Sequence, residues 1–253
     1  MNTISPPPEF KRISGTKRLF GVVLGLTGAA AANALLGYSV FSFYTRNTTF
    51  VPYDTSSPDL LTPTFTKHNP LKNAPICIDH AIKTLPLQKF RERYGLKEGE
   101  KVPVERLTTD FCRGIWSGIG FRVQRRYLEK KYRALPGRED HLWDVKQLEK
   151  SEYPVGEKIV DHFEVVDHDA NKVTVRCGDS PLNQDHRASD GLFSMEVTTD
   201  ERADTATFHL KSVFVNTTEE GKGLEPLPWN FQLAHRWYTK LWMEGATRKM
   251  LKQ

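Results

Sequence analysis

Side chains that bind metal ions or transfer protons are concentrated between residues 161 and 169. Asp161-His162-Phe163-Glu164 and Asp167-His168-Asp169 bring aspartate, glutamate and histidine within a few residues of one another. On a β-strand, His162 and Glu164 would share the face opposite Phe163, because successive side chains alternate between faces. This pattern is typical of a solvent-facing strand that ends in an acidic turn, so we predict no metal site here.

Asp161 is a weak candidate for a catalytic residue. Its place in the alternation puts its carboxylate on the same face as Phe163, among apolar side chains. A carboxylate buried among apolar groups is costly unless it is hydrogen-bonded, and perturbed carboxylates are common at functional sites. Asp161 is therefore expected to bind a polar group of a ligand or to act as an acid or base. The alternative is a position at the end of the strand, still in contact with water.

The loop over residues 178–191 gathers more charged side chains, namely Asp179, Asp185, His186, Arg187 and Asp190. Loops on a rigid sheet often carry function, but turn formation alone also explains this content of Asp, Asn, Ser, Pro and Gly. Both interpretations stay open. Cys177, just before the loop, falls on the apolar face, which predicts a small core residue and not a nucleophile.

Common catalytic signatures do not occur in the sequence. It holds no nucleophile elbow, P-loop or HExxH motif, and its three cysteines match no zinc-binding spacing. Gly114, Gly118 and Gly120 lack the preceding strand of a dinucleotide-binding loop and indicate close helix packing. The excess of 36 Lys plus Arg over 31 acidic residues is too small to indicate nucleic acid. We therefore predict no cofactor, no metal ion and no nucleic-acid partner.

The N-terminal region contains a long uncharged segment. Residues 19–45 carry no charged side chain, and about 20 apolar residues suffice for a helix to cross a bilayer. The basic tail over residues 1–18 has more positive charge than the flank after the segment, where Arg46 follows. The positive-inside rule then predicts a single-pass anchor with the N-terminus in the cytosol or matrix. A cleaved signal peptide ending near Ala30-Ala31-Ala32 is the alternative.

The predicted orientation in the membrane leads to expectations about glycosylation and about the organelle. With the N-terminus in the cytosol, Asn216-Thr217-Thr218 would lie in the lumen as a glycosylation acceptor. Asn47-Thr48-Thr49 is too close to the membrane for the same expectation. We predict the membrane of the endoplasmic reticulum, with the mitochondrial inner membrane as the alternative.

The rest of the chain divides into a tether and a domain. Residues 46–75 are rich in Thr, Ser, Asn and Pro and show no period, which predicts an extended tether. The domain, over residues 76–253, begins with a strand over 76–85 and a short helix over 86–94. Apolar residues at helical spacing over 104–134 then predict two helices or one kinked helix.

The second half of the domain changes to a period of two residues. Four segments alternate between apolar and polar side chains, which predicts an antiparallel sheet. Their apolar sets are Ile159, Phe163 and Val165; Val173, Val175 and Cys177; Phe193, Met195 and Val197; and Phe208, Leu210 and Phe214. The last segment, 228–250, has a helical stripe that would cover this sheet. The expected fold is therefore α+β, with the sheet wrapped on a long C-terminal helix.

This order of elements resembles the helix-grip fold of START-like proteins, also called Bet v 1-like or SRPBCC domains. The similar pieces are Gly156 before Phe163-Glu164-Val165-Val166, the strand Val173-Thr174-Val175 before Asp179, and a strand leading to a helix near His235. With its anchor, the chain also resembles a fungal group of membrane-anchored hypothetical proteins, through Leu142-Trp143-Asp144, Arg176-Cys177-Gly178-Asp179-Ser180-Pro181 and Tyr238-Thr239-Lys240-Leu241-Trp242. The resemblance implies a cavity between sheet and helix, and it brings no catalytic residues with it.

The apolar face predicts what such a cavity would bind. Its side chains are almost all aliphatic or aromatic, so the ligand would be hydrophobic. The candidate ligand-binding residues are Phe163, Val175, Phe193, Met195, Phe208 and Tyr238.

Three functions fit this expectation. A membrane-tethered pocket could steer the cyclisation or isomerisation of an intermediate in fungal secondary metabolism, beside other enzymes of the pathway, by holding a reactive conformer. A noncatalytic lipid or sterol carrier would need the same cavity. A structural membrane protein would need none. One basic stretch could meet anionic lipid near the anchor or simply form a solvated helix face; it contains Arg122, Arg125, Arg126, Lys130 and Lys131.

Overall fold

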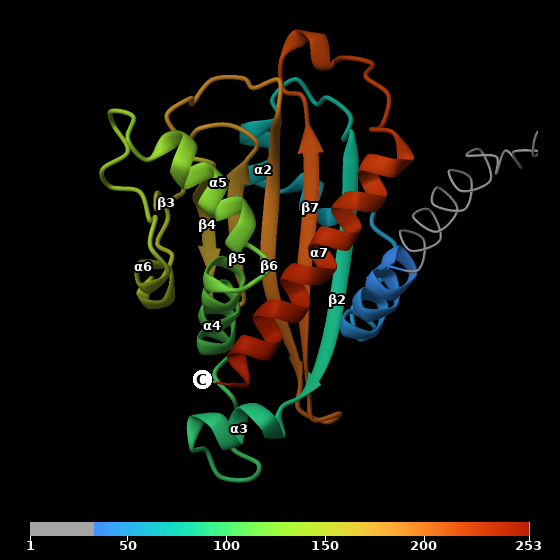
Figure 1. The fold of residues 1–253 in the computed structure, drawn as a ribbon, viewed down its shortest axis with the longest axis vertical. Helices are drawn as coiled ribbons and strands as arrows, with labels where there is room; N and C mark the ends of the chain where they lie inside the picture. The colour runs from blue at the N-terminus through green and yellow to red at the C-terminus, as the bar shows by residue number, and fades with distance from the viewer. Residues whose placement is uncertain (1–32, 253) are drawn as a thin grey trace, which may run out of the picture. The chain divides into compact units, whose positions relative to one another are not determined.

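The computed structural model describes residues 33–252 (Figure 1). The chain divides into two units, Met1–Tyr44 and Thr45–Gln253. In the first unit, residues 33–44 are helical. Within the described residues, no helix has the length and apolar character that crossing a membrane requires. Most of the expected anchor over residues 19–45, and the alternative cleavage site at residues 30–32, lie outside the described part of the chain.

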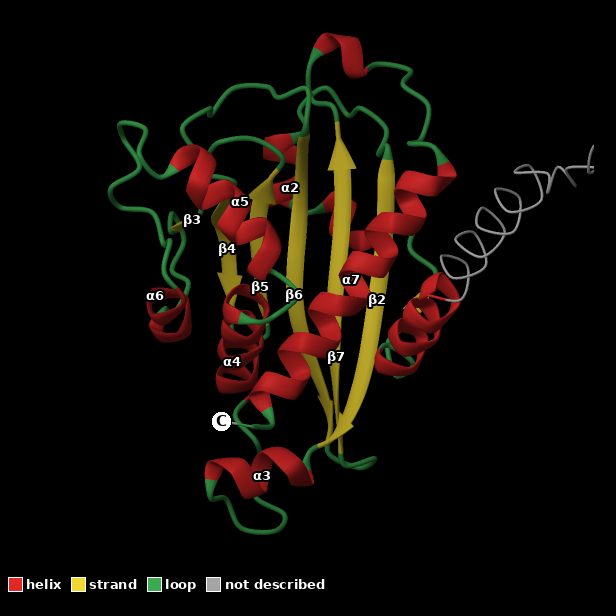
Figure 2. Cartoon of the chain, viewed as in Figure 1, coloured by secondary structure: helices red, strands yellow, loops and turns green. Residues whose placement is uncertain are grey.

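The second unit is built on one antiparallel sheet of seven strands in the order β1-β2-β7-β6-β5-β4-β3 (Figure 2). The α+β class and the C-terminal helix are as expected from the sequence. A β-bulge interrupts the pairing of β4 and β5 between Val165 and Asp167. The strands are β1 (Thr49–Val51), β2 (Cys77–Pro86), β3 (Lys158–Ile159), β4 (Phe163–Asp169), β5 (Lys172–Cys177), β6 (Asp190–Asp200) and β7 (Thr205–Val215).

The helices predicted over 86–94 and 228–250 are present, the segment 104–134 forms two helices, and η1 and α2 were not predicted. The α-helices are α2 (Pro63–His68), α3 (Gln88–Tyr94), α4 (Val104–Ser117), α5 (Arg122–Tyr132), α6 (Val145–Lys150) and α7 (Trp229–Met250), and the short 3-10 helices are η1 (Pro58–Leu61) and η2 (Glu219–Gly221).

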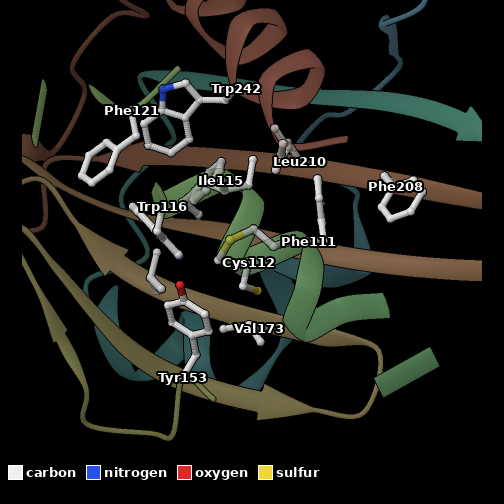
Figure 3. Close-up of a cluster of buried hydrophobic side chains, with 14 of the residues drawn as sticks. Phe111, Cys112, Ile115, Trp116, Phe121, Tyr153, Val173, Phe208, Leu210 and Trp242 are labelled. Carbon is white, nitrogen blue, oxygen red and sulfur yellow. The ribbon is translucent and has the colours of Figure 1, made fainter. Parts of the chain in front are cut away.

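The main core lies between one face of the sheet and the helices α4 and α7 (Figure 3). The two helices approach closely because Gly114 has no side chain: a Cβ there would lie 2.9 Å from the Ala246 carbonyl oxygen. Gly120 meets Trp242 in the same way, at 2.9 Å from its Cα. The glycine-rich segment is therefore a packing device, as the sequence indicated.

A buried ion pair fixes α7 to strand β2. Lys83 of β2 lies 2.7 Å from the carboxylate of Glu244, and both side chains are almost fully buried. Thr48 donates a hydrogen bond of 2.9 Å to the other Glu244 oxygen. The second half of α7 is thus held in place by polar as well as apolar contacts.

The segment 46–75 is folded, which corrects the expectation of an extended tether. It contains β1, η1 and α2, and Phe65 packs with Leu192, Val213 and Val215 in a second core on the other face of the sheet. Strands β6 and β7 carry apolar side chains on both faces at this end, so their second face needs a cover. The Pro and Thr residues of the segment start short helices: Thr62 caps α2, whose first residue is Pro63.

Candidate functional site

A cavity of about 200 Å³ opens between α5, α7 and the sheet. Figure 1 shows α4, α5 and α7 on the same side of the sheet. Most of the cavity wall is apolar. Its lining residues are Gln124, His162, Phe163, Cys177, Gly178, Phe193, Phe214, His235, Tyr238, Thr239 and Trp242.

Aromatic rings make up most of the wall. The Trp242 ring lies 5.3 Å from Phe193 and 5.2 Å from Tyr238, both edge to face. Phe163 contacts Trp116 of α4 at 4.7 Å between ring centroids. Such ring pairs hold one another in fixed orientations, so the wall has a defined shape.

One hydrogen bond joins the two helices across the cavity. The Tyr238 hydroxyl donates to the Gln124 side-chain oxygen at 2.9 Å. Burial raises the pKa of Tyr238 to about 12, so the hydroxyl keeps its proton at neutral pH and stays a donor.

His235 is a polar residue of the cavity lining, and it is hydrogen-bonded to Asp79, which lies outside the lining. The Nδ1 atom of His235 lies 2.6 Å from an Asp79 carboxylate oxygen, and the Asp79 side chain is 1% exposed. The other oxygen of Asp79, and the hydroxyl of its cross-strand neighbour Ser212, have no hydrogen-bond partner among the described residues. With Nδ1 held by the carboxylate, Nε2 is the ring nitrogen left to meet a ligand. An imidazole oriented in this way can accept or donate a proton.

Cys77 stands beside this pair. Its sulfur and the ligand atoms of Asp79 and His235 all lie within 4.8 Å of one another, and these three residue types can together hold zinc. Burial, and then the Asp79 charge, raise the pKa of the Cys77 thiol to about 11. A metal ion would therefore have to displace a proton from a buried thiol as well as break the Asp79–His235 hydrogen bond.

The six candidate ligand-binding residues divide into two groups. Phe163, Phe193 and Tyr238 line the cavity. Val175, Met195 and Phe208 are fully buried and belong to the main core, but they are not among the lining residues. The Phe208 ring, for example, contacts Phe111 of α4 at 5.0 Å. Strand alternation identified the correct face of the sheet, but not which part of that face α4 covers.

Asp161 lies outside the lining of the cavity. It sits in the turn between β3 and β4, where Val160 and Asp161 both have positive φ, so the strand alternation does not extend to it. Its buried carboxylate accepts hydrogen bonds from the Ser180 hydroxyl at 2.6 Å and from Arg138 at 3.2 Å. Through these hydrogen bonds Asp161 connects its own turn to the segments that contain Ser180 and Arg138.

The loop over residues 178–191 is held to the sheet by a buried network. Asp190 accepts two hydrogen bonds from Arg176, at 2.7 and 3.0 Å, and a third from Thr217 at 3.0 Å. Arg187 donates to the Asn183 carbonyl oxygen. The charged side chains thus shape the loop, while Gly178 at its start lines the cavity.

Two other titratable groups line the cavity. Burial raises the pKa of Cys177 to about 12, so its thiol is not a nucleophile at neutral pH. Burial also lowers the pKa of His162, which favours the neutral imidazole.

Sequence reasoning missed Asp79 and His235 as a pair. They are 156 positions apart, so no local motif joins them. One signal was present: Asp79 falls on the same inward face of the first strand as Cys77 and Ala81, where a charged residue is unusual.

Compared with known proteins, the chain matches no family model, no curated protein and no solved structure.

Proposed function

We propose that the protein binds a hydrophobic small molecule in the cavity between α5, α7 and the sheet. The observation that carries this proposal is the lining, in which Phe163, Phe193, Phe214 and Trp242 leave few polar groups. A concave, mostly apolar site with a small number of polar groups is the usual form of a small-molecule site. Here those polar groups include His235 and Gln124, so the ligand carries at least one hydrogen-bonding group on an otherwise apolar body.

We propose in addition that residues 76–253 form a helix-grip-like domain of the START type. In support, the 22-residue helix α7 packs along one face of the antiparallel sheet, with the cavity beside it. The resemblance noted in the sequence implies the same arrangement. A helix-grip domain encloses its ligand between these two elements, which is where the cavity lies.

The membrane is part of the proposal. The uncharged segment 19–45 would anchor the chain as a single-pass protein, in the endoplasmic reticulum. An anchored pocket stays close to hydrophobic molecules that partition into the bilayer, and to membrane-bound enzymes that make or use them. A fungal secondary-metabolite intermediate is a ligand of this kind.

A second candidate, catalysis in the same cavity, rests on the Asp79–His235 pair. Their 2.6 Å hydrogen bond fixes the orientation of the imidazole. A cyclisation or isomerisation that needs one proton moved could then use His235, while the aromatic wall holds the reactive conformer. A noncatalytic carrier would need the wall alone.

Copurification tests the binding proposal. The full chain, purified from its native membranes and extracted with organic solvent, should release a stoichiometric hydrophobic molecule detectable by mass spectrometry. A chain that brings no such molecule, and binds none when hydrophobic candidates are added, has a cavity without this function.

A further inference from the structure

The outer face of α5 carries an exposed apolar stripe. Val123 and Tyr127, one helical turn apart, are 77% and 60% exposed, and Ile119 in the turn just before the helix is 67% exposed. Large apolar side chains exposed together in this way usually mark an interaction surface. The opposite face of the same helix packs inward through Leu128 and lines the cavity through Gln124.

Basic side chains flank this stripe. The one acidic residue of α5, Glu129, is engaged by Arg125 at 3.2 Å and by Arg133 at 2.6 Å. The remaining basic residues of the helix are in no ion pair within the described part of the chain. They are Arg122, Arg126, Lys130 and Lys131, all exposed.

The second helix at the cavity is also apolar on its outside. Trp229 and Phe231, in the first turn of α7, are exposed. The Tyr238–Gln124 hydrogen bond connects this half of α7 to α5. Both helices that border the cavity therefore present large apolar side chains to their surroundings.

We propose that the outer face of α5, formed by Ile119, Val123, Tyr127 and the four flanking basic residues, docks on the surface of an anionic bilayer. An apolar stripe with basic flanks is the pattern of helices that lie in the membrane interface, where apolar side chains enter the acyl boundary and cations meet lipid headgroups. The absence of unpaired acidic side chains on α5 favours an anionic lipid surface over a basic partner. This docking goes beyond ligand binding, and it holds whether or not the cavity is occupied.

A fluorescent label on the stripe tests the proposal in the full chain. The natural cysteines, Cys77, Cys112 and Cys177, are all buried, so a nitrobenzoxadiazole dye will react selectively at Val123→Cys. With vesicles of phosphatidylcholine and phosphatidylserine, its emission should shift to the blue and gain intensity, because the dye enters the interface. The matched control is Leu61→Cys, which is also exposed but lies in the segment that covers the other face of the sheet.

The two positions separate docking of α5 from mere attachment by the N-terminus. An anchor alone brings both labels near the vesicle without burying either, so docking predicts a shift at position 123 and none at position 61. Equal shifts at both positions, or no shift at position 123, overturn the proposal. A concentration-dependent shift at position 123 without vesicles would assign the face to a second copy of the chain and also overturn it.

Charge variants test the lipid specificity. The docking constant should fall about fivefold for each charge removed in Arg122→Gln and Arg126→Gln, and the shift should weaken as salt is raised. Lys101→Gln, an exposed lysine outside α5, is the control and should change nothing. A docking constant that is the same for the double variant, or for pure phosphatidylcholine, contradicts an anionic partner.

Discussion

The Tyr238 hydroxyl donates a hydrogen bond of 2.9 Å to the Gln124 side-chain oxygen, and so joins α7 to α5 across the cavity. A bound molecule that leaves between these helices has to pass this contact. Gln124 and Tyr238 both line the cavity, so the hydrogen bond belongs to the site as well as to the fold.

Replacing Tyr238 by Phe should remove this hydrogen bond between α7 and α5. We expect a loss of about 1 kcal/mol in unfolding free energy, the net value of one such hydrogen bond, together with faster release of the bound molecule. Tyr94→Phe is the matched control, because Tyr94 donates a comparable hydrogen bond of 2.7 Å to Asp110 but is not a lining residue. Denaturant unfolding and a dissociation-rate measurement on both variants decide the matter: equal release rates would show that the contact does not control exit.

His235→Gln separates catalysis from binding. If His235 moves a proton in the reaction, conversion of the copurified molecule should slow by about 10²- to 10⁴-fold, while the molecule stays bound. Asp79→Asn should slow conversion as well, because the carboxylate no longer fixes the imidazole. The control is His162→Gln, because His162 also lines the cavity but has no carboxylate at hydrogen-bond distance among the described residues. Mass spectrometry of the bound molecule over time gives the rates, and unchanged conversion in His235→Gln favours a carrier.

Asp59 should make stability depend on pH below about 4. Burial opposes its charge, but hydrogen bonds from Lys172 and Lys211 override that effect and lower the pKa of Asp59 to about 2. An unfolded aspartate has a pKa of about 3.9. The folded value is the lower one, so the stabilisation is complete above pH 4 and disappears as the pH falls to 2.

The Asp59→Asn variant checks this expectation. Its unfolding free energy should be lower than that of the wild type at neutral pH, and the difference should narrow between about pH 4 and 2. Glu98→Gln, at an exposed glutamate with no ion pair in the described part of the chain, should leave the profile unchanged. Because Asp59 belongs to η1, a flat difference would contradict the docking of the segment 46–75 on the sheet.

The membrane anchor predicts the behaviour of two forms of the chain. The full chain should stay in the membrane pellet after carbonate extraction, because the uncharged segment 19–45 is costly to expose to water. A piece covering residues 45–253 should be released into the supernatant. It begins at Thr45 because the compact unit starts there and the buried Thr48 is hydrogen-bonded to Glu244. Release of the full chain by carbonate would rule out the anchor.

Local pattern predicted the fold well wherever one face of an element is buried. The alternation over Val173, Val175 and Cys177 predicted the strand and its inward face. Helical spacing predicted the final helix but not its buried face, because Phe231 is exposed and the core side of α7 is formed by Trp242, Met243, Ala246 and Met250. It failed for the segment 46–75, whose short elements are stabilised by the packing of Phe65 against two strands about 130 and 150 residues further along the chain. A short window of sequence holds no information about packing partners so far along the chain.

The candidate site was predictable in its apolar part only. Phe163, Phe193 and Tyr238 follow from period and face, since each lies inside a regular element. The Asp79–His235 pair depends on how α7 crosses β2, which no spacing in the sequence encodes. For Asp161, the strand pattern was applied too far. Asp161 lies in a turn with positive φ, where side chains no longer alternate between the two faces of a sheet.

The central claim, an open cavity that holds a hydrophobic molecule, is tested most directly by enlarging two neighbouring residues of β5. Both side chains are buried in the main core, but Cys177 lines the cavity, whereas Val175, two residues earlier on the same face, does not. We predict that Cys177→Phe keeps a stability near that of the wild type but loses the copurified molecule, since its ring takes the ligand's place. Val175→Phe should instead lose about 1–3 kcal/mol through overpacking. A Cys177→Phe chain that retains its full amount of bound molecule, or is destabilised as much as Val175→Phe, would contradict the account.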